Sequence, residues 1–473
     1  MRLRLPFDTQ IDAPSRFPTG IRQVITRPSL PGLKLALAVM TVFGLVSNVA
    51  IGVLVASGAL DGEWYDFRDL GIAVGQLREG LDDRFDPAVS YIVTMLIGGI
   101  GILSLIGGLL IILPWVERRL LARFQIRRGP NRVGPFGLLQ PLADAFKLMQ
   151  KETIVPRGAD RFIYFLPPVI VFIPLMLVWG IVPWAPRMVY VDTNVGVLYL
   201  IAVGSLATLA IFLAGWSSNN HYALLGAMRT VAMMISYEIP LSISLLAVVL
   251  MSGTMQLSGI VEWQAAHNTW FAFLMPFGLF TFFFSSTAEL NRTPNDIAEA
   301  ESEIVAGFHT EYSGMKAGLY LAVELGHAVA TGAFVSTLFL GGWSLFGLEE
   351  WIPPYMILAG KISLIYFVLV WLRSTLPRFR LDQLMAFAWK FLIPLSIIYV
   401  LVVSLEASIF ARWDVEGLIP LVIFAVVNTA LAWFLIRRWA AVMGYRPGVE
   451  PTRPLMATGV GGLRAARQLR GDA

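Results

Sequence analysis

The chain has 473 residues, of which 56% are hydrophobic and 14% charged, with a net charge of +4 and a mean hydropathy of +0.69. This composition excludes a water-soluble domain, in which about a quarter of the residues are charged, and indicates a membrane protein. The absence of cysteine excludes disulfides, cysteine-ligated iron–sulfur clusters, thiolate zinc sites and cysteine nucleophiles. The four histidines, at 221, 267, 309 and 327, stand singly rather than in the paired spacing of metal or haem ligands.

Ten largely apolar stretches are long enough to cross a bilayer as helices. They predict an all-α polytopic membrane protein. The predicted spans are residues 35–56, 91–115, 163–185, 195–216, 231–252, 269–289, 316–343, 355–372, 391–408 and 417–436. The first stretch could instead be a signal peptide, but it begins late and lacks a small-residue cleavage site.

The basic residues are distributed unevenly between the connections. If the N-terminus lies in the cytoplasm, 30 of the 36 Lys and Arg residues fall on that side, five fall outside and one, Lys361, lies within a span. This is the positive-inside pattern. The connection 57–90 is acidic instead, with eight Asp and Glu residues against three arginines. We therefore expect both termini in the cytoplasm.

A basic loop follows the second span and contains Glu117-Arg118-Arg119 and Arg127-Arg128-Gly-Pro-Asn-Arg-Val-Gly-Pro. Composition alone favours a topogenic loop that contacts lipid phosphates. The Gly and Pro residues also predict a defined turn. The residues that follow, from Phe136 onward, have helical apolar spacing with charged side chains opposite. They predict a short amphipathic helix on the membrane surface.

Ionisable residues inside spans cost about 2.5–3.5 kcal/mol each near a helix centre and usually serve a function. Glu238 lies in the fifth span, Glu289 closes the sixth and Glu324 lies in the seventh. One interpretation is that they are buried against partners that fix helix packing. Lys361, in the eighth span, is explained at least as well by snorkelling of its ammonium group to the interface.

The connection 289–312 is acidic although it lies on the predicted cytoplasmic side. Its acids are Glu289, Asp296, Glu299, Glu301, Glu303 and Glu311. They could form an ordinary solvated face. Closely spaced carboxylates also disfavour one another's ionisation, so that protons can be held and passed near neutral pH. The sharper hypothesis is a proton-handling acidic channel.

Together these segments resemble the quinone-site membrane subunit of proton-pumping NADH:quinone oxidoreductase, respiratory complex I, which is the H subunit of the bacterial enzyme and subunit 1 of the mitochondrial one. The resemblance covers about residues 91–405. Its motifs, in order, are Glu117-Arg118-Arg119, Arg127-Arg128-Gly-Pro-Asn-Arg-Val-Gly-Pro, Gly137-Leu-Leu-Gln-Pro-Leu-Ala-Asp144, Gly215-Trp-Ser-Ser-Asn-Asn-His, Ile235-Ser-Tyr-Glu238, Ala288-Glu289-Leu-Asn-Arg292-Thr-Pro294, Glu299-Ala-Glu301-Ser-Glu303, Glu311-Tyr-Ser-Gly, Phe339-Leu-Gly-Gly-Trp343 and Arg373-Ser-Thr-Leu-Pro-Arg378-Phe-Arg380-Leu-Asp382-Gln383.

The resemblance implies roles for individual residues. The chamber through which quinone reaches an iron–sulfur cluster of a partner, or its entrance, would be bordered by Arg118, Gln125, Arg127 and Phe146. The inner end of the chamber would face Asp296, Glu299, Glu301 and Glu303. A proton relay toward the pumping subunits would consist of Glu238, Glu289 and Glu324. Charged support would come from Arg229, Arg292 and Asp382.

The resemblance also implies the partners. Quinone would be a substrate, this chain would bind no metal or cofactor, and FMN and the iron–sulfur clusters would belong to partner subunits of the peripheral arm. Small and antiporter-like membrane subunits would complete an assembly in the bacterial cytoplasmic membrane. Residues 91–408 would form the core of eight spans. Residues 1–90, with an acidic external loop, and residues 409–473, with a basic tail, would each add one span.

The sequence departs from the family pattern at Asn295, Ile297 and Ala298, where Phe, Leu and Pro are usual, and at Leu325 and His327. These changes put the loop shape and the type of quinone in question. Two alternatives remain open. One is a related subunit of a membrane-bound nickel–iron hydrogenase or formate hydrogenlyase. The other is a stand-alone ion transporter in which the intramembrane acids bind the ion.

Overall fold

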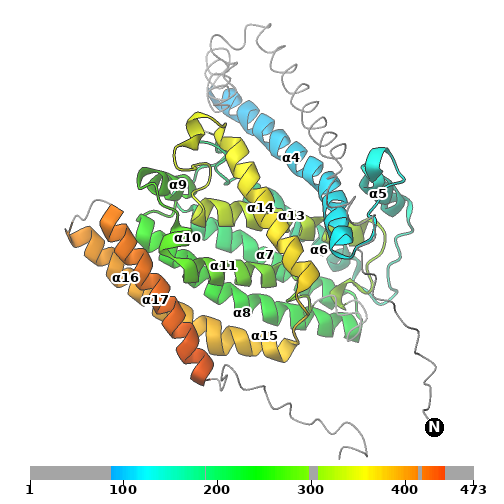
Figure 1. Ribbon diagram of the computed structural model, residues 1–473. Coiled ribbons are helices and arrows are strands. Elements are labelled where there is room, and N and C mark those ends of the chain that lie inside the picture. The colour runs from blue at the N-terminus through cyan, green and yellow to red at the C-terminus, as the bar shows by residue number, and fades with distance from the viewer. Residues whose placement is uncertain (1–86, 187, 298–306, 414–417, 443–473) are drawn as a thin grey trace, which may run out of the picture.

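The computed structural model describes residues 87–186, 188–297, 307–413 and 418–442. These ranges fold into helices and loops (Figure 1). The long helices are α4 (Pro87–Phe124), α6 (Arg161–Trp179), α7 (Gly196–Ser217), α8 (His221–Ser252), α11 (Pro276–Glu289), α13 (Met315–Phe339), α14 (Pro354–Thr375), α16 (Ile393–Trp413) and α17 (Leu418–Val442). The shorter ones are α5 (Gln140–Gln150), α9 (Leu257–Ala266), α10 (Phe271–Leu274), α15 (Leu381–Phe387), η1 (Pro135–Gly137), η2 (Gly307–His309), η3 (Leu348–Glu350) and η4 (Ala388–Leu392).

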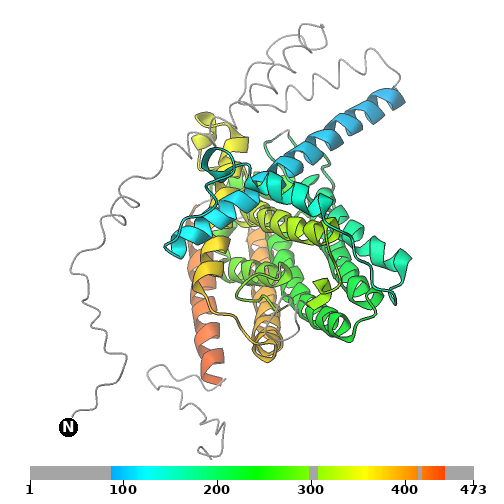
Figure 2. The ribbon, with the colours of Figure 1, turned by 90° about the vertical axis from the view of Figure 1, so that its right-hand side faces the viewer.

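The core is a bundle centred on α8 and α13. Helix α8 packs against α7, α11 and α16, and α13 packs against α6 and α14. In Figure 1, α5 lies beside the C-terminal half of α4, on the opposite side of the bundle from α16 and α17. Figure 2 shows the N-terminal part of α4, in blue, extending beyond the bundle. At 38 residues, α4 is about 57 Å long, well above the ~30 Å of a bilayer core.

Within the described residues, eight helices are long and apolar enough to cross a membrane, and they match eight of the predicted spans. The predicted span 35–56 lies outside the described residues. The amphipathic segment forms α5, whose 11 residues are too few to cross a bilayer. The all-α polytopic prediction is therefore confirmed, while the count of ten spans stays a prediction.

The prediction of one continuous helix over 269–289 is wrong. The segment forms α10 and α11, separated at Met275, which has φ −131° and ψ 60°. Pro276 lacks an N–H group and disfavours helical geometry in the residue before it. It is well placed as the first residue of α11. The third span also ends early, because α6 stops at Trp179.

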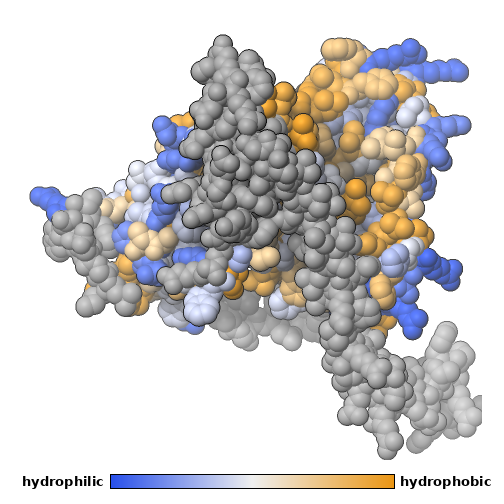
Figure 3. All heavy atoms as spheres, turned by 90° about the horizontal axis from the view of Figure 1, so that it is seen from above, coloured by the Kyte–Doolittle hydropathy of each residue, from blue (hydrophilic) through white to orange (hydrophobic). Residues whose placement is uncertain are grey.

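The outward faces of the bundle are apolar. In Figure 3, broad patches of apolar side chains lie between hydrophilic side chains that project at the edge. Leu198, Leu209 and Trp216 of α7 are more than half exposed. Such a surface matches the hydrocarbon of a bilayer. Polar side chains buried inside the bundle therefore need partners within the protein.

Candidate functional site

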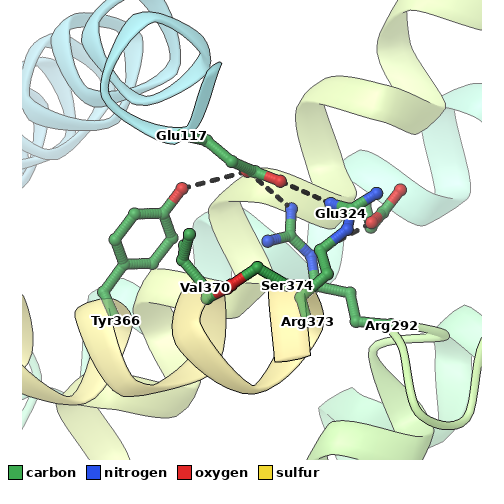
Figure 4. Close-up of polar contacts among 7 residues, drawn as sticks. All are labelled: Glu117, Arg292, Glu324, Tyr366, Val370, Arg373 and Ser374. Atoms are coloured by element: carbon green, nitrogen blue, oxygen red, sulfur yellow. Dashed lines mark hydrogen bonds and ion pairs between the residues drawn. The ribbon is translucent and has the colours of Figure 1, made fainter. Parts of the chain in front are cut away.

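A cluster of charged side chains lies buried between four segments of the chain (Figure 4). Arg292 donates from Nη2 to Oε2 of Glu117 at 3.2 Å and from Nε to Oε1 of Glu324 at 3.0 Å. Arg373 forms a second ion pair with Glu117, and the hydroxyl of Tyr366 donates to Glu117 at 3.1 Å. The side chains of Arg292 and Glu117 are only 4% and 7% exposed. Two arginines thus face two carboxylates within the bundle.

The five members of this cluster come from three helices and one loop. Glu117 lies near the end of α4, Glu324 in the third turn of α13, and Tyr366 and Arg373 on α14. Arg292 lies in the loop directly after α11, where Asn291 adopts a left-handed conformation with φ 52°. Asparagine tolerates that conformation better than most residues. The turn lets a loop residue point back into the bundle.

The cluster holds Arg292 in its charged form. Burial alone favours the neutral form of the guanidinium, but the carboxylates of Glu117 and Glu324 raise the pKa of Arg292 above its ordinary value. Arg292, which the sequence predicts as charged support, thus forms ion pairs with two buried carboxylates. Glu117, Tyr366 and Arg373 were not among the predicted site residues, although Glu117 and Arg373 lie in the motifs that carry the resemblance.

Two neighbouring cavities are lined by the three predicted relay glutamates. The first, of about 90 Å³, is lined by Glu238 and Glu289 together with mainly apolar residues. The second, of about 60 Å³, is lined by Glu289 and Glu324. A cavity of roughly 10–15 Å³ is already large enough for one water molecule, so each of the two cavities has room for water. Glu289 lines both cavities, and Glu324 joins the second one to the charged cluster.

The sequence around the glutamates shapes these cavities. A Cβ atom at Gly204 would lie 3.2 Å from Oε1 of Glu289, so a small residue on α7 leaves room for the carboxylate. The two residues before Glu238 on α8 are held by hydrogen bonds to α15 and η4. Tyr237 donates to the carbonyl of Leu384, and Ser236 accepts from the indole of Trp389. Trp389 lies in η4, a π-helical turn, a feature that often accompanies functional sites.

Arg118, the residue after Glu117, links α4 to the surface helix. Its guanidinium donates to Oδ2 of Asp144 on α5 at 2.6 Å, and Lys147 donates to Oδ1 of the same carboxylate at 3.2 Å. Partial burial opposes ionisation of Asp144, but these two hydrogen bonds hold its pKa below the ordinary value. Successive residues of α4 therefore contact the surface helix and the buried cluster.

The other residues that the resemblance places at the quinone chamber lie on the outer surface of this region. Gln125 accepts from Nε of Arg127 at 2.6 Å in the turn after α4, and Phe146 is exposed on α5. None of these three side chains lines the two cavities at the glutamates. The turn itself is organised by Arg119, which donates to the carbonyls of Pro130 and Phe136.

The acidic loop is described only in part. Asp296 pairs with Arg378 at 3.8 Å, and Glu311 accepts from the amide of Asn220 at 2.6 Å. Three of the predicted site residues, Glu299, Glu301 and Glu303, lie outside the described residues, as does Ala298. The two other predicted charged supports lie on further elements: Arg229 on α8, and Asp382 exposed on the first turn of α15.

Two further ionisable residues inside spans lie apart from this site. Lys361 does not snorkel: it is buried and donates to the carbonyls of Leu340, Gly342 and Ser344 at 2.6–2.8 Å. It thereby holds the loop after α13. Glu406 on α16 accepts from Nδ2 of Asn428 on α17 at 2.9 Å and lines neither glutamate cavity.

The structure thus defines a polytopic helical membrane protein with a buried ionic cluster and cavity-linked carboxylates. In the described part of the chain, no group of three or more His, Asp or Glu residues could hold a metal ion. The family model for NADH dehydrogenase matches residues 97–404.

Known relatives give the same family. The H subunit of the NADH-quinone oxidoreductase of Dehalococcoides mccartyi is 49% identical over 299 residues, which cover 63% of this chain and 83% of that protein. The corresponding protein of Geobacillus kaustophilus is 47% identical over 295 residues, 62% of this chain and 88% of that protein. NADH-quinone oxidoreductase subunit 8 of Thermus thermophilus is 45% identical over 301 residues, 62% and 81% of the two chains. The chain belongs to the NADH dehydrogenase family, among the H subunits of NADH-quinone oxidoreductases.

Proposed function

We propose that this chain is the membrane subunit of a proton-pumping NADH-quinone oxidoreductase that forms part of the quinone chamber and couples quinone reduction to proton movement. The names of its relatives support the complex. The observation that carries the coupling role is a polar path made of hydrogen bonds, ion pairs and two neighbouring cavities. It runs from α5 through adjacent residues of α4 to Arg292 and Glu324, and then through two cavities to Glu289 and Glu238.

The surface end of this path would meet quinone. Arg118, Gln125, Arg127 and Phe146 would border the chamber or its entrance, and the acidic loop, from Asp296 through Glu299, Glu301 and Glu303, would face its inner end. The flavin and the iron–sulfur clusters would belong to partner subunits, so that no electron passes through this chain. Quinone reduction consumes protons and therefore changes the charge balance at this end.

The ionic cluster would transmit that change. Arg292 is shared between Glu117 and Glu324, so a change in charge beside Glu117 alters how strongly Arg292 stabilises the ionised form of Glu324. A unit charge 4 Å away is worth about 4 kcal/mol at an effective dielectric constant of 20, enough to favour one protonation state over another. Glu324 would then exchange protons with Glu289 and Glu238 through water in the two cavities.

The test is to purify the chain, tagged at one end, from its native membrane in mild detergent. We expect co-purification of an iron–sulfur peripheral arm and NADH-driven, inhibitor-sensitive quinone reduction. A nickel–iron partner with hydrogen chemistry would overturn the quinone role while retaining the fold. A lone monodisperse chain would favour an ion transporter.

A further inference from the structure

Two histidines lie in the cavity between Glu289 and Glu324. His309 comes from η2, at the end of the acidic loop, and His327 comes from α13. The same cavity is lined by the hydroxyl-bearing ring of Tyr320. The relay described above uses carboxylates alone, so neither imidazole has a role in it.

His327 occupies the boundary between the two cavities. Both cavities are lined by Ala207, Met234, Glu289, Leu290 and His327. Only Glu289 and His327 among these five carry a titratable group. His327 is also three residues after Glu324 on α13, and side chains with that spacing lie on the same face of a helix. The imidazole of His327 therefore lines the same cavity as the carboxyl groups of Glu324 and Glu289.

The surroundings of His309 favour a neutral imidazole. Its ring lies edge-on to Tyr320, with 5.1 Å between centroids, and is tilted against the ring of Phe308. Burial lowers the pKa of His309 to about 4. A neutral imidazole has one N–H donor and one acceptor nitrogen, so it can accept a proton on one side and release one from the other.

We propose that His327 is a proton carrier between Glu289 and Glu324, with His309 as a second imidazole on the side of the acidic loop. This inference rests on the proposed proton-coupling function. In the transfer, a proton leaves the carboxyl group of Glu289, directly or through a cavity water, and binds the free ring nitrogen of His327. The proton on the other ring nitrogen then passes to the carboxylate of Glu324. No bond between heavier atoms changes and no electron is transferred.

The arrangement at Glu324 is compatible with this step. Arg292 binds Oε1 of Glu324, and Glu324 also lines the cavity that contains His327. The carboxylate can thus remain ion-paired while it exchanges protons with the cavity.

The test compares His327→Asn with His327→Ala in the intact complex reconstituted into proteoliposomes. Asparagine keeps a polar group but cannot carry a proton between two sites, whereas alanine leaves space for a small molecule. We expect both variants to assemble and to pump protons at least tenfold more slowly than wild type. Added imidazole should restore pumping in His327→Ala, and thiazole, which has a similar shape and is far less basic, should not.

The matched control is His221→Asn, because His221 is exposed at the start of α8 and should leave pumping unchanged. Wild-type pumping in His327→Asn, or equal rescue by imidazole and thiazole, would show that His327 only fills space and would overturn the proposal. Glu238→Gln, measured in parallel, separates the two ideas. If Glu238→Gln stops pumping while His327→Asn does not, the histidine proposal alone fails. If both variants pump normally, the proposed coupling function fails as well.

Discussion

Arg292 is the residue on which the buried cluster depends, since it is the only described side chain that hydrogen-bonds to both Glu117 and Glu324. A buried charge that loses its partner costs more than the pair contributes, because the remaining ion is still desolvated. Loss of the charge of Arg292 is therefore expected to destabilise the folded protein.

Replacement of Arg292 tests this directly. Arg292→Met removes the cation that Glu117 and Glu324 share and leaves Glu324 without its ion pair to Arg292, and removal of one partner of a buried pair costs about 3–5 kcal/mol. We expect a marked loss of assembled complex on native gels. Arg292→Lys keeps the charge but cannot bind both carboxylates with a planar fork, so it should assemble better than Arg292→Met. Equal assembly of Arg292→Met and wild type would contradict the structural role of the cluster.

His309 predicts a pH dependence of stability. Its pKa in the folded chain, about 4, lies below the ordinary 6.5. As the pH falls below about 6.5, the unfolded state binds a proton that the folded state does not, so stability that is fully present above that pH is lost as the pH drops toward 4. The groups that face His309 in its cavity are Glu289, Tyr320, Glu324 and His327.

We therefore expect the thermal midpoint of the complex to fall less between about pH 7 and about pH 5 in His309→Asn than in wild type. If the thermal midpoints of the two proteins change with pH in parallel, the burial of His309 does not contribute to the pH dependence of stability.

At the scale of elements, α4 connects the surface helix to the bundle. Its residue 118 contacts α5 and its residue 117 contacts the loop after α11 and helix α14. Adjacent residues on one rigid helix move together. A displacement of α5 that moves Arg118 would therefore also move Glu117 relative to Arg292. Coupling of this kind requires evidence that both ends respond to the same change.

Asp144→Asn provides such evidence. The change removes the charge that pairs with Arg118, and a partly exposed pair of this kind is worth at most about 1 kcal/mol. We expect normal assembly but a several-fold higher KM for quinone, because α5 is less firmly attached to α4. Lys147→Gln, which alters the other partner of Asp144 on the same helix, is the matched control and should change KM little. An unchanged KM in Asp144→Asn would argue against a role of α5 at the chamber.

Hydropathy predicted most elements well, but it could not find the break at Met275, because the segment is apolar on both sides of Pro276. Glu238, Glu289 and Glu324 were recognisable as charges in apolar surroundings, and the structure brings them to two neighbouring cavities. A role for Glu117 in the cluster was harder to predict, since this residue lies at the end of a span beside two arginines and resembles part of a basic loop. Tyr366 has no local signal at all, because its role depends on a contact 249 residues away in sequence.

At the scale of the whole molecule, the polar path is confined to the part of the chain that the family model matches. Glu406 and Asn428 lie beyond it, between α16 and α17. Glu406 is therefore an intramembrane glutamate that does not line either of the two cavities. It offers an internal comparison for the relay.

The most direct measurement is the number of protons pumped per NADH oxidised by complexes that carry Glu238→Gln or Glu406→Gln, with assembly verified first. Glutamine keeps the shape of glutamate but does not titrate. We expect Glu238→Gln to assemble normally, to pump few or no protons and to reduce quinone poorly, while Glu406→Gln matches wild type. Full pumping and quinone reduction by Glu238→Gln would contradict the relay through the two cavities.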